Sequence, residues 1–129
     1  MKTVALFNIK GGVGKTTSAV NLAWLAGQAG LRTTVWDLDP QGCAGWYLGV
    51  DDALLQQRAA KAIEGKLALT ELRLPTAHAN VSVVPSDLSM RKLDTLFETQ
   101  EAGKNYLRNL LKPLAADTDL AIFDCAPAL

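Results

Sequence analysis

The sequence has few residues of the kinds that mark an exported, membrane-spanning or strongly charged protein. Its 129 residues include two cysteines, Cys43 and Cys125, too few for a disulfide framework. The apolar stretch at residues 4–7 is too short for a secretory signal, and no stretch is long enough to span a bilayer. The 13 basic residues balance 13 acidic ones, so no net charge favours nucleic acid or an anionic membrane. We therefore expect a cytoplasmic protein with reduced thiols and no membrane contact.

Short apolar segments alternate with longer segments of helical periodicity. Strands are predicted at 3–9, 33–38, 81–84 and 120–123, and helices at 16–29, 51–63, 87–97 and 104–114. Residues 67–80 give no clear prediction. Strands that alternate with helices pair in parallel through right-handed crossovers. Because no repeat or linker interrupts the chain, the prediction is one α/β domain over 1–129, with a mostly parallel sheet between two helical layers.

A glycine-rich segment follows the first predicted strand and opens the first predicted helix. Glycines let the backbone curl so that successive N–H groups face one anion, and the positive end of the helix adds to the attraction. Lys15 would reach the β- and γ-phosphates of a nucleotide, and the Thr16 hydroxyl would bind Mg²⁺. The alternative is a tight turn that merely requires glycines. The predicted phosphate-binding residues are Gly11, Gly12, Val13, Gly14, Lys15, Thr16 and Thr17.

The loop departs from the common phosphate-loop pattern in one informative way. The position that normally holds the first glycine is Ile9, and a second lysine, Lys10, begins the loop. With this variant the sequence resembles the deviant Walker-A ATPases of the ParA and MinD family, which have the P-loop NTPase fold. The resemblance implies ATP as the nucleotide, and a nucleotide-sandwich homodimer in which Lys10 reaches the partner's phosphates. The alternative for Lys10 is a solvated loop lysine.

Three aspartates lie at the ends of predicted strands, at the sheet edge where ligands of open parallel sheets bind. Asp37 and Asp39 belong to the string Asp-Leu-Asp-Pro-Gln-Gly, which resembles the family's second motif and favours its ParA branch. The resemblance implies that Asp39 positions or activates the attacking water and that Asp37 supports the Mg²⁺ shell. The alternative for both is a capping or turn aspartate. Asp124 ends an apolar strand, as a Walker-B carboxylate that acts on Mg²⁺ does. Ala126 stands where the family has the first of two prolines.

These residues together describe phosphoryl transfer from ATP to water, which depends on positioning and charge neutralisation. The resemblance implies a dimerisation-dependent ATPase switch in DNA or plasmid partitioning or cargo positioning, with a ParB-like adaptor and a location in the cytoplasm or on the nucleoid. The basic stripe Lys104, Arg108 and Lys112 is interpreted as a solvated helix face or, as the minor alternative, a non-specific DNA contact. Alternative functions are a nucleotide-binding module without hydrolysis, and a MinD-like or secretion-associated ATPase.

The length of 129 residues is short for the family. We expect a C-terminally truncated fold that lacks the adenine pocket, with an exposed strand edge covered by a partner or an exchanged segment. Cys43 and Cys125 are predicted to be small buried residues, and His78 an exposed one. The tryptophans are predicted to pack in the core or against loops.

Overall fold

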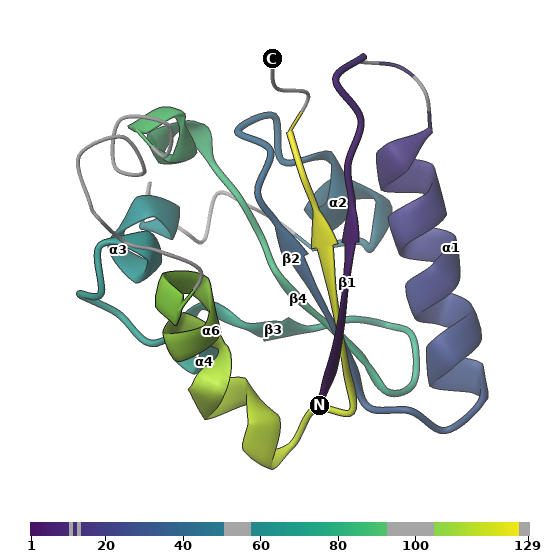
Figure 1. Cartoon of the computed structure of the whole chain (residues 1–129). Coiled ribbons are helices and arrows are strands. Elements are labelled where there is room, and N and C mark those ends of the chain that lie inside the picture. Colours follow the sequence, from purple (N-terminus) through teal and green to yellow (C-terminus); the bar gives the residue numbers. More distant parts are fainter. Residues whose placement is uncertain (11, 13, 51–57, 93–104, 127–129) are drawn as a thin grey trace.

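One five-stranded sheet forms the centre of the molecule in the computed structural model, which describes residues 1–10, 12, 14–50, 58–92 and 105–126 (Figure 1). The strand order is β1-β5-β2-β4-β3. Neighbouring strands pair in parallel except β3, which is antiparallel to β4. The mostly parallel α/β fold predicted from the sequence is thereby confirmed. The strands span Lys2–Leu6 (β1), Thr33–Asp37 (β2), Leu74–Pro75 (β3), Val81–Val84 (β4) and Leu120–Asp124 (β5).

Helices cover both faces of this sheet, as the three-layer prediction requires (Figure 1). One face carries α1 (Lys15–Gln28) and α2 (Cys43–Tyr47). The other carries α3 (Ala59–Ile63), α4 (Leu69–Leu72) and α6 (Asn105–Leu111). The central strand β2 is buried along its whole length, and its alternating side chains enter two separate cores. Val35 packs with α1 and α2, whereas Trp36 packs with α3, α4 and α6.

Helix α1 lies close to the sheet because its inner face consists of small residues. Ala19 and Ala23 are completely buried against the strands. Near the end of the helix, a Cβ on Gly27 would lie 2.6 Å from the carbonyl oxygen of Ala79, in the loop before β4. Asn80 donates from its side-chain amide to the carbonyl of Gly27 at 3.1 Å, which ties the helix to the same loop. The C-terminal end of α1 is therefore held against the sheet at backbone distance.

Several elements differ from the sequence prediction. The helix predicted over 104–114 ends at Leu111 and continues as a 3₁₀ helix, Lys112–Ala116, because Pro113 has no N–H to donate. The helix predicted over 87–97 begins as a 3₁₀ helix, Leu88–Lys92, and its remainder lies outside the described residues. Residues 51–57 of the helix predicted over 51–63 also lie outside them. The short elements α2, α4 and β3 were not predicted.

Strand β1 is an edge of the sheet and is paired, among the described strands, with β5 alone. Its residues from Lys2 to Ala5 are exposed, including the apolar Val4. Within the described residues, β1 is therefore an exposed edge of the sheet. Its coverage by a partner or an exchanged segment stays a prediction.

Candidate functional site

The glycine-rich loop joins β1 to α1 at the carboxyl end of the sheet. Gly12 and Gly14 adopt left-handed backbone conformations, with φ of 72° and 89°. A Cβ at either position would meet no atom within 4 Å, so the backbone conformation and not lack of space favours glycine there. Gly14 is the N-cap of α1 and supplies no side chain, which leaves N–H groups of the first turn available to an anion. Gly11 and Val13, predicted to join this loop, lie outside the described residues.

Thr16, in the first turn of α1, contacts Asp124, the last residue of β5, although 108 positions separate them in the sequence. The Thr16 hydroxyl donates to Oδ2 of Asp124 at 2.7 Å. Asp124 is 1% exposed, and its other oxygen, Oδ1, is buried without a hydrogen-bond partner among the described residues. Burial raises the pKa of Asp124, although the Thr16 hydroxyl and the charge of Lys15 act in the opposite direction. A hydroxyl beside a carboxylate oxygen with no partner is an arrangement into which a hard cation fits.

Asp37 lies opposite Asp124 in the β2–β5 pairing but makes different contacts. Its Oδ1 accepts a hydrogen bond from the backbone N–H of Asp39 at 2.9 Å, and its Oδ2 accepts one from that of Ala44 at 3.2 Å. The side chain is completely buried. Burial is the largest cause that raises the pKa of Asp37 to about 7, and the nearby charge of Asp124 adds to it. Asp37 therefore contacts the loop after β2 through both of its oxygens.

A hollow of about 360 Å³ joins the glycine-rich loop to the loop after β2. Asp39 lines it, and its Oδ1 accepts a hydrogen bond from the backbone N–H of Gln41 at 3.0 Å. Lys10 is exposed outside this lining, where its backbone N–H donates to the Asn8 side chain. The lining residues are Gly12, Gly14, Lys15, Thr16, Thr17, Asp39, Gln41, Cys43 and Tyr47.

Three of these lining residues were not predicted as part of the site: Gln41, Cys43 and Tyr47. The prediction that Cys43 is buried is wrong, because the residue is exposed at the start of α2. Tyr47 stacks edge to face with Trp46, at a ring distance of 5.1 Å, and Trp46 is 74% exposed. The signal in the sequence was the aromatic pair close behind the Asp39 string, in a chain with few aromatic residues. The periodicity of five residues is too short to reveal α2.

The oxygen ligands at this end of the sheet are of the kind that Mg²⁺ prefers. The described residues hold no group of three or more histidine, cysteine or acidic side chains that could bind a metal by themselves. Mg²⁺ differs from metals that need such a cage, because it usually takes one or two protein oxygens and completes its shell with water and phosphate oxygens. The Asp124 carboxylate and the Thr16 hydroxyl could supply these protein oxygens.

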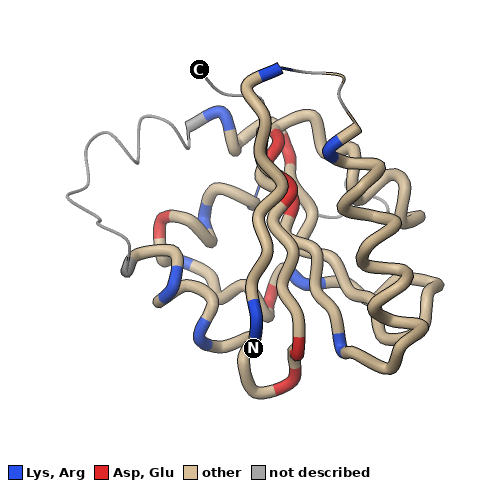
Figure 2. Tube along the Cα trace, turned by 45° about the vertical axis from the view of Figure 1, so that its right-hand side comes forward, with Lys and Arg blue, Asp and Glu red and all other residues tan. Residues whose placement is uncertain are grey.

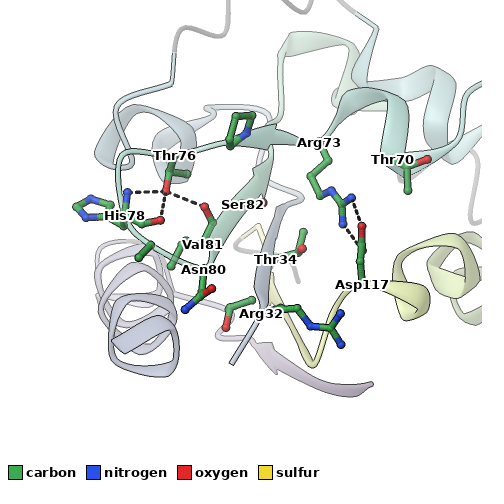
Figure 3. A pocket seen from close by; sticks show the side chains of 13 residues that line it. Arg32, Thr34, Thr70, Arg73, Thr76, His78, Asn80, Val81, Ser82 and Asp117 are labelled. Carbon is green, nitrogen blue, oxygen red and sulfur yellow. Dashed lines mark hydrogen bonds and ion pairs between the residues drawn. The ribbon is translucent and has the colours of Figure 1, made fainter. Parts of the chain in front are cut away.

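A second hollow, of about 560 Å³, lies at the opposite end of the strands (Figure 3). Arg73 donates through both terminal nitrogens to Asp117, at 2.7 and 2.6 Å. Arg32 donates to both oxygens of Asp119. These pairs join α4 and the start of β2 to the loop before β5, so the arginines of this hollow already have carboxylate partners. The two groups of acidic positions, one at each end of β5, are visible in Figure 2.

The remaining predicted residues lie outside the hollow at the glycine-rich loop. Arg108 and Lys112 are exposed, and Lys104 of the same stripe lies outside the described residues. Cys125, predicted to be buried, is half-buried beside the core. His78, predicted to be exposed, is half-buried in the wall of the second hollow. Among the described helices, none combines the length and apolar character that a membrane crossing requires.

Comparison with known proteins identifies the family. A family model described as an AAA domain matches residues 1–129. The chromosome partitioning protein ParA of Myxococcus xanthus is 37% identical over 128 residues, which are 99% of this chain and 45% of that protein. The sporulation initiation inhibitor protein Soj of Bacillus subtilis is 30% identical over 128 residues, 99% of this chain and 51% of Soj.

Solved structures agree with these sequence relatives. A cobyrinic acid a,c-diamide synthase from Mycobacterium smegmatis, with a bound ATP analogue and magnesium, has a TM-score of 0.90 at 26% identity, over 99% of this chain and 51% of the synthase. A variant of McdA from Cyanothece in complex with ATP has a TM-score of 0.87 at 28% identity, over 100% of this chain and 49% of McdA. The chain thus spans about half the length of the proteins it matches. It has the P-loop NTPase fold and belongs to the AAA domain family, as a relative of ParA.

Proposed function

We propose that this chain is the nucleotide-binding half of a ParA-type ATPase, which binds Mg²⁺-ATP at the glycine-rich loop and hydrolyses it in a switch that depends on dimerisation. The observation that carries the proposal is the contact of Thr16, at the start of α1, with Asp124, one of whose buried oxygens has no hydrogen-bond partner among the residues that the structure describes. The ATP analogue, ATP and magnesium in the neighbouring structures support the same ligands here.

Each residue has a task that its position supports. The N–H groups of the loop and of the first turn of α1 would hold the phosphates, and Lys15 would neutralise charge on the transferred group. Thr16 and Asp124 would hold Mg²⁺, which polarises the phosphoryl oxygens when bound. Asp39, whose side chain lines the hollow, would orient the attacking water. Lys10 is exposed and would reach the phosphates of a second copy.

The cellular role follows from the relatives. Proteins named for chromosome partitioning are 37% and 30% identical to this chain, which supports a role in moving or positioning DNA or another cargo. The partners proposed are a second copy of the chain, a ParB-like adaptor that stimulates hydrolysis, and DNA bound without sequence preference. Arg108 and Lys112 are exposed and available for phosphate contacts.

ATP binding and ATP turnover, measured on the same sample, test the proposal. Turnover should depend on Mg²⁺ and rise with protein concentration, because two copies build the site. Lys15→Ala and Lys10→Ala should each lower turnover about 100-fold or more, since each removes a charge from the transition state. Lys61→Ala, an exposed lysine of α3 outside the hollow and outside the basic stripe, is the matched control.

Two outcomes would decide against parts of the proposal. Full activity of either lysine variant would exclude the dimerisation-dependent mechanism. ATP binding without any turnover, with or without added DNA and adaptor, would instead identify a nucleotide-binding module.

A further inference from the structure

The loop after β2 is held by one buried carboxylate. Asp37 ends β2, is 0% exposed, and accepts the backbone N–H of Asp39 on one oxygen and that of Ala44 on the other. The two N–H groups lie at the two ends of the segment 39–44, so the carboxylate joins the start of this loop to the first turn of α2. Few other side chains could do this, because both acceptors must point inward from one buried position.

The loop that Asp37 holds brings side chains into the candidate site, whereas Asp37 itself stays outside. Asp39, Gln41 and Cys43 line the hollow beside the glycine-rich loop, and Asp37 is absent from its lining. Both Asp37 oxygens are already engaged by backbone N–H groups. By contrast, Asp124 keeps Oδ1 without a partner in the described part of the chain. The two aspartates are therefore equipped for different tasks, although they face each other on β2 and β5.

Further backbone contacts connect the loop to the same strand. The N–H of Leu38 donates to the carbonyl of Asp124 at 3.0 Å, which extends the β2–β5 pairing by one residue. The N–H of Gly42 donates to the carbonyl of Asp39 at 2.9 Å, and Gly42 has a left-handed φ of 68°. Beyond Leu38 the backbone of the loop no longer pairs with β5. The two hydrogen bonds to the Asp37 carboxylate therefore hold the loop where strand pairing has ended.

The geometry points to Asp37 as a positioning residue, which fixes the Asp39 carboxylate relative to the glycine-rich loop and does not bind the metal shell. This inference rests on the proposed function, and it replaces the metal role that the family resemblance implied for Asp37. The distance of Asp39 from the phosphates would then depend on two hydrogen bonds that no substrate touches. A displacement of a reacting group by about 1 Å is enough to lower a rate about 100-fold.

Asp37→Asn is the sharpest variant, because it keeps the size of the side chain and removes one acceptor. The Asn amide offers one oxygen and one NH₂ group, so one of the two backbone N–H groups would face a donor. That buried N–H would lose its partner, and the loop would leave its position at one end. Thr118→Val, also buried at 2% exposure but at the opposite end of the sheet, is the control for an ordinary loss of stability.

The first measurement is steady-state kinetics at several Mg²⁺ concentrations. Asp37→Asn should lower kcat about 100-fold, while the KM for ATP and the Mg²⁺ concentration at half-maximal rate stay within about threefold of the unaltered protein. Adding Asp37→Asn to Asp39→Asn should cause no further loss, because both act through Asp39. A rate that is restored by raising Mg²⁺ would overturn the inference and return Asp37 to the metal shell. An unchanged kcat would overturn it as well.

The second measurement does not need turnover and separates this inference from the proposed function. In a Cys125→Ala background, Cys43 is the remaining thiol, and it lines the hollow one residue before Ala44. A bound ATP analogue should protect Cys43 from maleimide in the unaltered protein and in Thr118→Val, but much less in Asp37→Asn at equal occupancy of the analogue. Equal protection in Asp37→Asn would overturn the inference. Absence of turnover in the unaltered protein, with this difference in protection present, would contradict only the proposed function.

Discussion

The two ends of the central strands use aspartate in opposite ways. Before β5, Asp117 and Asp119 each bond to an arginine, and these arginines hold the pKa of both carboxyls below the usual range, that of Asp119 at about 2. At the other end, Asp37 and Asp124 are buried, have no ion pair in the described part of the chain, and have raised pKa values. Aspartate therefore contributes to the stability of the fold at one end of the strands and lowers it at the other.

This difference indicates which end is built for chemistry. A buried carboxylate without a cation lowers stability unless another group compensates for its charge. Such an arrangement is worth keeping where a ligand brings the missing charge. The Arg73–Asp117 pair in Figure 3 and the Arg32–Asp119 pair need no such ligand. The larger hollow beside them is therefore the weaker candidate for a site.

The sharpest way to break the comparison is to neutralise one aspartate at each end. Asp124→Asn should lower ATP turnover about 100-fold or more, because the site loses its metal-facing charge. Its stability without Mg²⁺ should be unchanged or higher, since a buried unpaired charge is removed. Asp117→Asn should do the reverse, with unchanged turnover and lower stability. Turnover assays and urea midpoints on both variants check this, and a large loss of stability in Asp124→Asn would contradict it.

The two ends of α1 also differ, because the C-terminal end is closely packed whereas the N-terminal end at the candidate site is open. Alanine substitutions of one glycine at each end test this difference. Gly27→Ala should lower the free energy of unfolding by about 1–3 kcal/mol, because its Cβ would lie 2.6 Å from the Ala79 carbonyl oxygen. Gly14→Ala meets no atom within 4 Å and should cost only about 1 kcal/mol for its left-handed backbone. Urea unfolding of the two variants measures the difference. Equal losses would mean that the close packing at the end of α1 relaxes freely.

The Arg73–Asp117 pair should make a modest contribution to stability. Arg73→Ala should lower the free energy of unfolding by about 1 kcal/mol, the upper range for a partly exposed ion pair with two hydrogen bonds. Turnover should not change. A double-mutant cycle with Asp117→Ala isolates the interaction between the two side chains. A coupling energy of zero would show that this interaction contributes nothing to stability. Arg32→Ala should cost less, because its pair with Asp119 is more exposed.

The dependence of stability on pH should have opposite slopes for the two ends. The pKa of Asp37 is about 7 in the folded chain, above an unfolded value of about 4. Folding therefore binds a proton between these values, and the contribution of Asp37 to stability falls as pH rises from about 4 to 7, by at most about 1.4 kcal/mol per pH unit. Asp119 stabilises above about pH 4 and loses that contribution as pH falls towards 2.

Urea midpoints without Mg²⁺ over pH 2–7 test these slopes. Asp37→Asn should flatten the upper range, and Asp119→Asn the lower range. If Asp37→Asn left the upper slope unchanged, another group would be responsible for it.

The smallest effect is expected at Ser86, which follows β4. Its hydroxyl is buried and has no hydrogen-bond partner among the described residues. Ser86→Ala should leave the free energy of unfolding unchanged or raise it by a few tenths of a kcal/mol up to about 1 kcal/mol, because a polar group without a partner is removed. A loss of more than about 1 kcal/mol would show that the hydroxyl has an unrecognised partner, such as a buried water.

The sequence predicted the parts of the molecule that depend on local pattern. The apolar runs and their spacing predicted the four longer strands and α1, and the glycines beside Lys15 and Thr16 predicted the loop between them. The two residues of β3 and the five residues of the helix α2 are too few for a strand or a helix period to show. Pro113 could have predicted the change from α6 to a 3₁₀ helix, because it breaks the hydrogen-bond pattern locally.

The candidate site could be predicted by residue type but not by contact. Asp37 and Asp124 were expected at the same edge of the sheet, since both end parallel strands. Which of them keeps an oxygen without a partner depends on where the backbone N–H groups of Asp39 and Ala44 fall, and only the folded loop decides this. The place of Cys43 in the lining of the hollow could not be predicted either, because it depends on the path of the same loop.

The aromatic pair on α2 also gives the chain an optical signal of its own. Trp36 is sealed in the core, whereas Trp46 is largely in water and touches Tyr47, whose ring lines the hollow at the glycine-rich loop. A quencher dissolved in the buffer would reach Trp46 readily and Trp24 of α1, which is 43% exposed, to a lesser degree, whereas Trp36 would be protected from it. Trp46 is the most exposed of the three tryptophans, so a change in the quenching of its emission can report a ligand that fills the hollow, without a label.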